Sequence, residues 1–411
     1  MTGEKIFKPC RLCANDGLFL IMSFGKTPLA DRLLSADELG QKEPEAPLEL
    51  AFCPRCYLVQ ITETVSPEIL FAQRYPYFSS SSESYLAHSR KNATEIMASR
   101  KLHAKSLALE IASNDGYMLK NFRERGIPVM GIDPAKPPAM AAMKAGIPTH
   151  NVFFDKRFAR RLAKEGSLAD VVIANNVLAH VADLNGFVEG ISVVLKDEGM
   201  AVIEVPYLAD MIEGCEFDTV YHQHLCYFSA TALDRLFRAH SLFLSHIKRI
   251  PVHGGSVRLY VEPRENPDDS VISMLEREDS LGIHDMDFYR SFAARARSLR
   301  KDLVDMLRGL KNKGKKIVGY GAAAKAATLL SYCGIGQNFL EYIVDAQPFK
   351  HGLYMGGNHL PVFSTRRLME DMPDYVLLLA WNLADEILAQ QEPYRRSGGR
   401  FIIPIPELRV I

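Results

Sequence analysis

The sequence predicts an α/β protein with an N-terminal zinc-binding domain, a central Rossmann-like sheet and a second, C-terminal Rossmann-like α/β domain. Three observations support this fold class. Two CxxC motifs lie near the N-terminus, a strand and helix alternation begins at Leu107, and a strand followed by a glycine turn recurs at 316–325. Such alternation is typical of parallel sheets with crossover helices. The predicted domains are residues 1–75, 76–262 and 263–411.

Length and charge narrow the class of protein. The 411 residues suffice for two or three domains, because one core seldom exceeds about 250 residues. Lys and Arg number 49 and so do Asp and Glu, so we expect no nucleic-acid partner, which would normally need a basic surface. Apolar runs fall short of the roughly 20 residues that span a bilayer, and the polar start resembles no signal peptide. We expect a cytoplasmic protein without a membrane partner, either a monomer or a small homo-oligomer.

The first element is a pair of cysteine motifs formed by Cys10, Cys13, Cys53 and Cys56. A CxxC turn directs both sulfurs to one ion, and zinc favours four thiolates in a tetrahedron. Because four ligands leave no open position for a substrate, we expect a structural zinc site that contributes folding energy. Residues 27–30 and a helix after them are expected to pack between the motifs.

A segment rich in aromatic and hydroxyl side chains follows, running from Tyr75 through Tyr77 to Ser82. Its tyrosines could close over a small-molecule site and hydrogen-bond a substrate. The alternative is a loop that covers the edge of a core. A helical pattern from Tyr85 to about Ala104 then leads to the central sheet.

The central sheet begins with an apolar strand that ends near Glu110. A turn of small and polar residues follows at 112–116, and Asp133 closes the next strand 23 residues after Glu110. Ligands of parallel sheets sit beyond the carboxyl ends of the strands, where a carboxylate can bind ribose hydroxyls. The turn lacks the GxGxxG pyrophosphate motif, so S-adenosylmethionine fits better than NAD. The predicted cofactor-binding residues are Glu110, Ala112, Asn114, Gly116, Asp133, Phe154 and Asn176.

Two later stretches place polar groups at the same edge. Asn176 follows the fourth strand and His180 comes shortly after it, although such residues could also be a helix cap. A fifth strand ends near Tyr207 and leads to the segment Phe217–Phe228, which contains Tyr-His-Gln-His at 221–224.

The two histidines of this segment allow three interpretations. They could form a metal pair with Glu213 or Asp218, they could supply a general base, or they could pack in a loop. Histidine titrates near neutrality, so we favour the general base. In an extended segment His222 and His224 would share one face, and a turn would change this arrangement.

The C-terminal third starts after a polar break at 263–269. A long helix is predicted from an apolar stripe at three- and four-residue spacing, formed by Tyr289, Phe292, Ala296, Leu299, Leu303, Met306 and Leu310. The stripe should pack on a domain face, or else on a partner helix. The strand and turn at 316–325 and the strands ending at Asp345 and Ala380 predict a second Rossmann-like half.

Taken together, the CxxC pair, the EIASNDG turn, the YHQH segment, the HGGSVR stretch at 253–258 and GYGAAAK resemble the sugar C-methyltransferase family over essentially the whole chain. The resemblance implies a class I methyltransferase sheet, a structural zinc and S-adenosylmethionine. It also implies a keto-deoxysugar substrate, carried on a nucleoside diphosphate and methylated at carbon 3 beside a 4-keto group.

The resemblance also implies roles for residues. The second histidine of the family's Tyr-His-Glu-His is expected to be the base, which here is His224. Gln223 departs from the family pattern, and a neutral amide cannot raise a histidine pKa as a carboxylate would. The implied catalytic residues are His224, Tyr221, His222, His180 and Tyr77, and the implied substrate contacts are Tyr75, Gln223, Lys325 and Asn382. The last two would hold the nucleotide end in the C-terminal domain, unless that domain is only a structural duplicate.

Two other functions remain open from the residues. An NAD-dependent sugar-nucleotide oxidoreductase would bind its dinucleotide at GYGAAAK, with Asp345 on the ribose. A non-catalytic nucleotide-sugar binding protein would retain only the fold, although the presence of Glu110, Asp133 and His224 argues against such decay.

Overall fold

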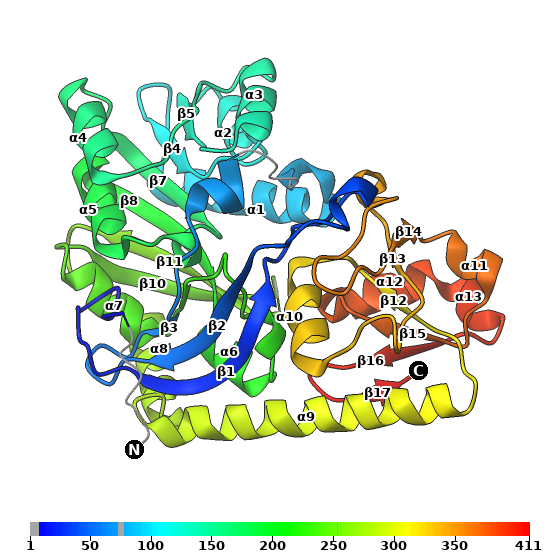
Figure 1. The fold of residues 1–411 in the computed structure, drawn as a ribbon. Coiled ribbons are helices and arrows are strands. Elements are labelled where there is room, and N and C mark those ends of the chain that lie inside the picture. The colour runs from blue at the N-terminus through cyan, green and yellow to red at the C-terminus, as the bar shows by residue number, and fades with distance from the viewer. Residues whose placement is uncertain (1–7, 73–77, 253) are drawn as a thin grey trace.

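The computed structural model describes residues 8–72, 78–252 and 254–411, so the predicted roles of Tyr75 and Tyr77 lie outside the described residues. These residues contain three sheets, of four, seven and six strands, and Figure 1 shows how the sheets are arranged. Within these residues, every helix is too short or too polar to cross a lipid bilayer.

The N-terminal sheet has the order β1-β2-β3-β9. Its strands are β1 (Phe19–Pro28), β2 (Glu45–Phe52), β3 (Val59–Ile61) and β9 (Cys226–Tyr227). The helix expected between the cysteine motifs is wrong, because an antiparallel ribbon of β1 and β2 fills this interval and only a 3-10 turn at Ala36–Glu38 is helical. The second half of β2 is buried on both faces, because Glu49 and Ala51 are buried as well as Leu48, Leu50 and Phe52.

Strand β9 is the element that joins the N-terminal sheet to the rest of the molecule. It comes from the Tyr-His-Gln-His region, far along the chain, and pairs with β3 through Val59 opposite Tyr227. The zinc-binding part therefore holds one end of the predicted catalytic segment.

The seven-stranded central sheet has the order β10-β11-β8-β7-β4-β5-β6. Strands β4 to β8 are parallel to one another, and β11 is antiparallel to both β8 and β10. Because β4 lies between β5 and β7, the strand order reverses beside β4, which is where such sheets bind ligands. The strands are β4 (Ala108–Ile111), β5 (Val129–Ile132), β6 (Thr149–His150), β7 (Ala169–Asn175), β8 (Leu195–Pro206), β10 (Phe243–Ile250) and β11 (Ser256–Glu262).

Helices connect and cover these strands (Figure 1). They begin with a polar residue at the N-cap in several cases, for example Asp155 before α4 and Asp183 before α5, each of which accepts a backbone N–H. The helices are α1 (Glu83–Arg100), α2 (Leu119–Arg123), α3 (Lys136–Lys144), α4 (Lys156–Lys164), α5 (Leu184–Val194), α6 (Leu208–Glu213) and α7 (Ala230–Arg238).

The C-terminal domain contains a six-stranded sheet of order β14-β13-β12-β15-β16-β17, parallel except for β17. Its strands are β12 (Ile317–Tyr320), β13 (Ile343–Asp345), β14 (Val362–Ser364), β15 (Tyr375–Leu378), β16 (Arg400–Ile403) and β17 (Arg409–Val410). Its helices are α10 (Ala324–Cys333), α11 (Arg367–Asp371), α12 (Ala384–Gln390) and α13 (Glu392–Arg396).

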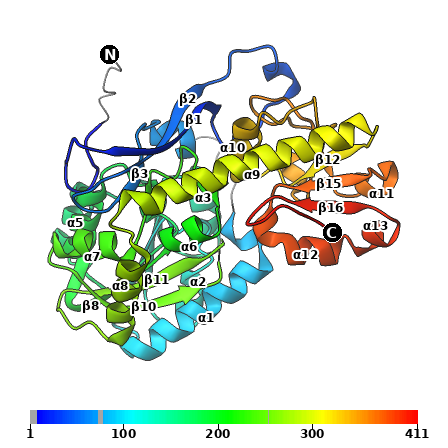
Figure 2. The same cartoon turned by 90° about the horizontal axis from the view of Figure 1, so that it is seen from below.

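Helices α8 (Asp269–Leu281) and α9 (Met286–Asn312) link the two larger sheets. Both views show α9 running beneath the molecule from one half to the other (Figures 1 and 2). The predicted stripe is buried from Tyr289 to Leu303, but Met306 and Leu310 are only partly buried and Leu307 takes the core position. The stripe packs on β1, α6 and α10 of the same chain.

Candidate active site

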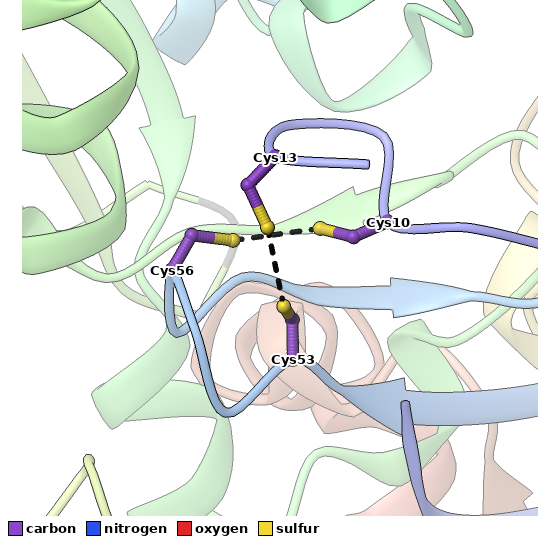
Figure 3. A group of neighbouring side chains, drawn as sticks. All are labelled: Cys10, Cys13, Cys53 and Cys56. Carbon is purple, nitrogen blue, oxygen red and sulfur yellow. Dashed lines mark hydrogen bonds between the residues drawn. The ribbon is translucent and has the colours of Figure 1, made fainter. Parts of the chain in front are cut away.

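The four predicted cysteines converge on one point, as Figure 3 shows. All four sulfurs lie within 4.8 Å of one another, with 3.4 Å from Cys10 to Cys56 and 3.5 Å from Cys13 to Cys53. A zinc–sulfur distance near 2.3 Å places tetrahedral sulfurs about 3.8 Å apart, so the cluster fits zinc. It is the only group of three or more His, Cys, Asp and Glu side chains in the described ranges that could hold a metal ion.

The predicted cofactor turn lies at the switch point beyond β4. Asp133 organises it, because its Oδ2 accepts the backbone N–H of Asn114 and its Oδ1 accepts that of Ala135, each at 2.8 Å. Ala112 and Asn114 have φ of 57° and 48°, so the turn uses left-handed backbone. At Gly116, with φ of 79°, a Cβ would lie 2.9 Å from Ile147, so the tight turn requires glycine.

Buried oxygen atoms without a partner gather at this edge. Among the described residues, four side-chain oxygens here have no hydrogen-bond partner: Oγ of Ser113, Oδ1 of Asp115, and Oδ1 of Asn175 and Asn176. The buried carboxyl of Glu110 lies beside them, with Tyr117 as its side-chain neighbour. Burial raises the pKa of Glu110 well above its usual range, and the charge of Asp133 adds to this rise. Unpartnered buried acceptors are costly unless a ligand supplies donors. S-adenosylmethionine offers an ammonium group, ribose hydroxyls and an adenine amine, so this set of acceptors fits it.

The end of the segment rich in aromatic and hydroxyl side chains, at Ser79 and Ser80, contacts this turn. The backbone N–H groups of Ser79 and Ser80 donate to Asn114 Oδ1 and Asp115 Oδ2 at 2.9 and 3.2 Å. Tyr85, in the first turn of α1, adds a contact that the sequence did not reveal. Its hydroxyl lies 3.1 Å from Asn176 Nδ2. The start of α1 therefore joins the cofactor edge.

A buried charged network holds α1 on the sheet. Glu204 Oε1 accepts from Arg258 Nε at 2.7 Å and from Asn92 Nδ2 at 3.1 Å, and His88 Nε2 lies 3.0 Å from the same carboxylate. Burial alone would raise the pKa of Glu204, but the bond from His88 and the charge of Arg258 outweigh it and the pKa is lowered. Arg258 gives a role to the HGGSVR stretch, which the sequence singled out without assigning one.

The Tyr-His-Gln-His segment is a turn. His224 N donates to Tyr221 O at 2.9 Å, so Tyr221 and His224 lie on one side, and the extended arrangement that would put His222 and His224 on one face does not form. His224 Nε2 is 2.9 Å from the Tyr221 hydroxyl, and His224 Nδ1 is 3.0 Å from the Thr219 carbonyl. The His180 ring is 5.0 Å from that of His224.

These contacts determine the tautomer of His224. A carbonyl oxygen only accepts, so a neutral His224 carries its proton on Nδ1 and donates it to Thr219. The Nε2 lone pair then accepts from the Tyr221 hydroxyl. His180 is oriented in the same way, because its Nδ1 donates to the Gln223 carbonyl at 2.6 Å, and burial lowers the pKa of His180. The site thus presents His224 with its Nδ1 held by the Thr219 carbonyl and its Nε2 facing the Tyr221 hydroxyl.

The other two side chains of the segment face the zinc-binding part. His222 is 0% exposed, its Nε2 donates to the Pro47 carbonyl of β2 at 3.2 Å, and burial lowers its pKa. Gln223 Nε2 donates to the Ala30 carbonyl at 2.7 Å. Both contacts anchor the segment to the zinc-binding part.

The predicted diphosphate contact Lys325 lies at the junction with the C-terminal domain. Its Nζ is 4.2 Å from the centroid of the Trp381 ring, and its charge acts on the carboxyls of Asp218 and Glu216. Asp218 Oδ2 accepts from Trp381 Nε1 at 2.7 Å. Burial raises the pKa of Asp218 to about 6 and that of Glu216 to about 8, and it lowers that of Lys325. Asn382 follows Trp381 and is half-buried.

Two further predicted residues have local surroundings that the sequence did not show. Phe154 is partly buried and packs edge-to-face on Phe187 of α5, with ring centroids 5.4 Å apart. Asp345 makes the same pair of hydrogen bonds as Asp133, because its Oδ2 and Oδ1 accept the backbone N–H groups of Ala322 and Gln347, each at 2.8 Å. Lys350 Nζ also lies 3.1 Å from Asp345 Oδ2.

The central sheet and the acceptor set at its switch point define the class, a Rossmann-like methyltransferase that uses S-adenosylmethionine. A model of the C-methyltransferase C-terminal domain matches residues 251–406, a methyltransferase domain model matches 86–243, and a zinc binding domain model matches 10–71. C-methyltransferase NovU of Streptomyces niveus is 35% identical over 405 residues, covering 98% of this chain and 96% of that protein. The chain therefore belongs to the C-methyltransferase family.

Two solved structures resemble part of the chain. Magnesium protoporphyrin IX methyltransferase of Synechocystis PCC 6803, with bound S-adenosylmethionine, is 10% identical, covers 44% of this chain and 81% of its own, and has a TM-score of 0.33. The sugar N-methyltransferase KedS8 of Streptoalloteichus sp ATCC 53650 is 19% identical, and the match covers 30% of this chain and 49% of KedS8, with a TM-score of 0.25. At these TM-scores neither likeness carries an argument about function.

Proposed function

We propose that this C-methyltransferase methylates carbon 3 of a nucleoside-diphosphate-linked keto-deoxysugar, beside a 4-keto group. The observation that carries the proposal is the Tyr221–His224 pair, in which the Thr219 carbonyl orients Nδ1 of His224 and the Tyr221 hydroxyl faces its Nε2. Methylation at carbon requires a carbon nucleophile, and a ketone beside the target carbon makes its proton acidic enough for a histidine to remove. The keto-sugar nucleotide itself rests on the resemblance of the motifs to sugar C-methyltransferases.

In this mechanism His224 is the base and Tyr221 is its partner. The Tyr221 hydroxyl turns from Nε2 to the ketone oxygen, which frees the Nε2 lone pair to accept the proton from carbon. The charge that develops on the ketone oxygen is then stabilised by the hydroxyl. The Thr219 carbonyl stabilises the resulting imidazolium through the Nδ1 proton. His180, with its ring beside that of His224, helps to enclose the reacting atoms.

The remaining residues hold the two reactants. When bound, S-adenosylmethionine supplies an electrophilic methyl group. Glu110 and Asp133 would hold its polar groups at the switch point, and the segment from Ser79 to Tyr85 would cover them. Such positioning converts an encounter of two reactants into a reaction within one complex. We place the nucleotide end of the sugar donor against the C-terminal domain, near Asn382.

The test uses the full-length zinc protein with methyl-labelled S-adenosylmethionine and a panel of nucleotide-linked 4-keto sugars. We expect label in one sugar product, with the new methyl located on carbon 3 by NMR. Methylation of oxygen would refute the proposal, as would absence of label from every keto sugar. Thermal stabilisation by NAD but not by S-adenosylmethionine would favour the oxidoreductase instead.

A further inference from the structure

Side chains of the C-terminal domain contact the segment Phe217–Val220, which we call the base-holding turn. Asp218 Oδ2 accepts from Trp381 Nε1 at 2.7 Å, and Thr328 Oγ1 donates to the Val220 carbonyl at 2.6 Å. The Tyr332 ring of α10 packs edge-to-face on Phe217, with centroids 5.3 Å apart. Thr328 and Tyr332 belong to α10, and Trp381 begins the 3-10 turn Trp381–Leu383.

The residue between these contacts is the one that orients the base. The Thr219 carbonyl accepts from His224 Nδ1 at 3.0 Å, and the Tyr227 hydroxyl lies 3.3 Å from the same oxygen. Thr219 is also fixed within the turn, because its Oγ1 donates to the Glu216 carbonyl at 2.7 Å. A shift of the turn would therefore move the acceptor of the Nδ1 proton.

Burial makes these contacts strict. Phe217 and Asp218 are 0% exposed and Thr328 is 2% exposed, so water cannot replace a lost partner at low cost. Lys325 lies against the Trp381 ring and offsets the buried acidic groups beside it.

We infer that Trp381 and Thr328 are positioning residues, through which the C-terminal domain fixes the Thr219 carbonyl and with it the Nδ1–H tautomer of His224. The inference rests on the proposed function only in treating His224 as the base. It gives the second Rossmann-like domain a direct part in the chemistry, in addition to any contact with the nucleotide.

The test reads the tautomer directly, without substrate. Full-length zinc protein is labelled with ¹⁵N-histidine, the His224 signals are assigned by comparison with His224→Asn, and long-range ¹H–¹⁵N spectra report which ring nitrogen carries the proton. The variants are Thr328→Val, which removes one hydroxyl, and Trp381→Phe, which removes the indole N–H. The matched control is Tyr394→Phe, which removes a buried 2.7 Å hydrogen bond to the Pro373 carbonyl in the same domain but away from the turn.

We expect wild type and Tyr394→Phe to hold His224 with its proton on Nδ1. The ratio of the Nδ1–H to the Nε2–H form should fall about fivefold or more in both test variants, because the displaced turn would weaken the hydrogen bond from Nδ1 to the Thr219 carbonyl that favours the Nδ1–H form. An unchanged ratio in Thr328→Val and Trp381→Phe would overturn the inference, and so would an equal fall in Tyr394→Phe. If Trp381→Phe fails to fold, Thr328→Val decides alone.

The outcome is separable from that of the proposed function. The tautomer of His224 can depend on Thr328 even if no keto sugar is methylated, in which case the proposed function fails and the positioning role of Thr328 and Trp381 stands. Conversely, methylation of a keto sugar with an unchanged His224 tautomer in both variants would keep the proposed function and remove this role of the C-terminal domain.

Discussion

Replacement of Asp133 by asparagine tests how the central sheet binds S-adenosylmethionine. Each oxygen of Asp133 already accepts one backbone N–H, from Asn114 and from Ala135, and each keeps a second lone pair for a ribose hydroxyl. An asparagine keeps the shape but has one acceptor oxygen and no charge. The amide N–H₂ of the asparagine would then face a backbone N–H. One hydrogen bond from the backbone is therefore lost, together with one hydrogen bond from a ribose hydroxyl.

The expected loss follows from these bonds. A hydrogen bond to a charged group contributes about 1.5 to 3 kcal/mol, so losing the charged ribose acceptor should cost roughly 2 kcal/mol in binding. That value corresponds to a roughly thirtyfold higher dissociation constant. Isothermal titration calorimetry with S-adenosylmethionine measures it. A dissociation constant for Asp133→Asn close to that of wild type would refute the assignment of Asp133 to the cofactor.

The chain offers a matched control in Asp345→Asn. Asp345 accepts the backbone N–H groups of Ala322 and Gln347, as Asp133 accepts those of its own turn, and Asp345 also contacts Lys350. Both variants should lower the melting temperature, but only Asp133→Asn should weaken cofactor binding. Equal weakening in both would mean that the effect is a general loss of stability.

The pKa of Asp133 gives a second measurement. Burial raises this pKa from 3.8 to about 6, and donors from a bound ribose favour the charged form. Affinity for S-adenosylmethionine should therefore be constant above about pH 7 and fall by up to about tenfold per pH unit below about pH 6. Folding shows the opposite sign, because a carboxyl with a raised folded-state pKa costs stability as pH rises from about 4 to 6. Asp133→Asn should remove the pH dependence of binding.

Three further predictions concern the base, the buried network and the metal. The first test places the protein in D₂O with the keto sugar and S-adenosylhomocysteine. Wild type and His222→Ala should exchange the proton of the target carbon for deuterium, and His224→Asn should not. Exchange at the wild-type rate in His224→Asn would exclude His224 as the base. Arg258→Met should lower the free energy of unfolding by about 3 to 5 kcal/mol in urea, because Glu204 stays buried without its partner, while the exposed control Arg264→Met should change little. Elemental analysis should find one zinc per chain. A chelator that removes the zinc should abolish methyl transfer, because β9 pairs with β3 of the zinc-binding sheet and the catalytic segment would lose this support. A fully active metal-free protein would contradict this prediction.

Features that depend on neighbours in the chain could be predicted from the sequence. The two CxxC motifs predicted a four-sulfur cluster, which the structure confirms. The alternation of strands and helices predicted both Rossmann-like sheets, and the two carboxylates at consecutive strand ends predicted the edge where Glu110 and Asp133 meet. Parallel neighbours end at the same edge, so spacing along the chain is sufficient for such features.

Only the tertiary structure decided which groups of the chemical segment face which partner. A strand period would place His222 with His224, but a turn separates them, and the partners that orient them are Pro47 for one and Thr219 for the other. Lys325, which the sequence suggested for a phosphate, lies against Trp381 beside buried carboxyls, and the sequence did not reveal these neighbours. The physical reason is that burial and hydrogen bonding depend on residues far apart in the chain, and local patterns contain no information about such partners.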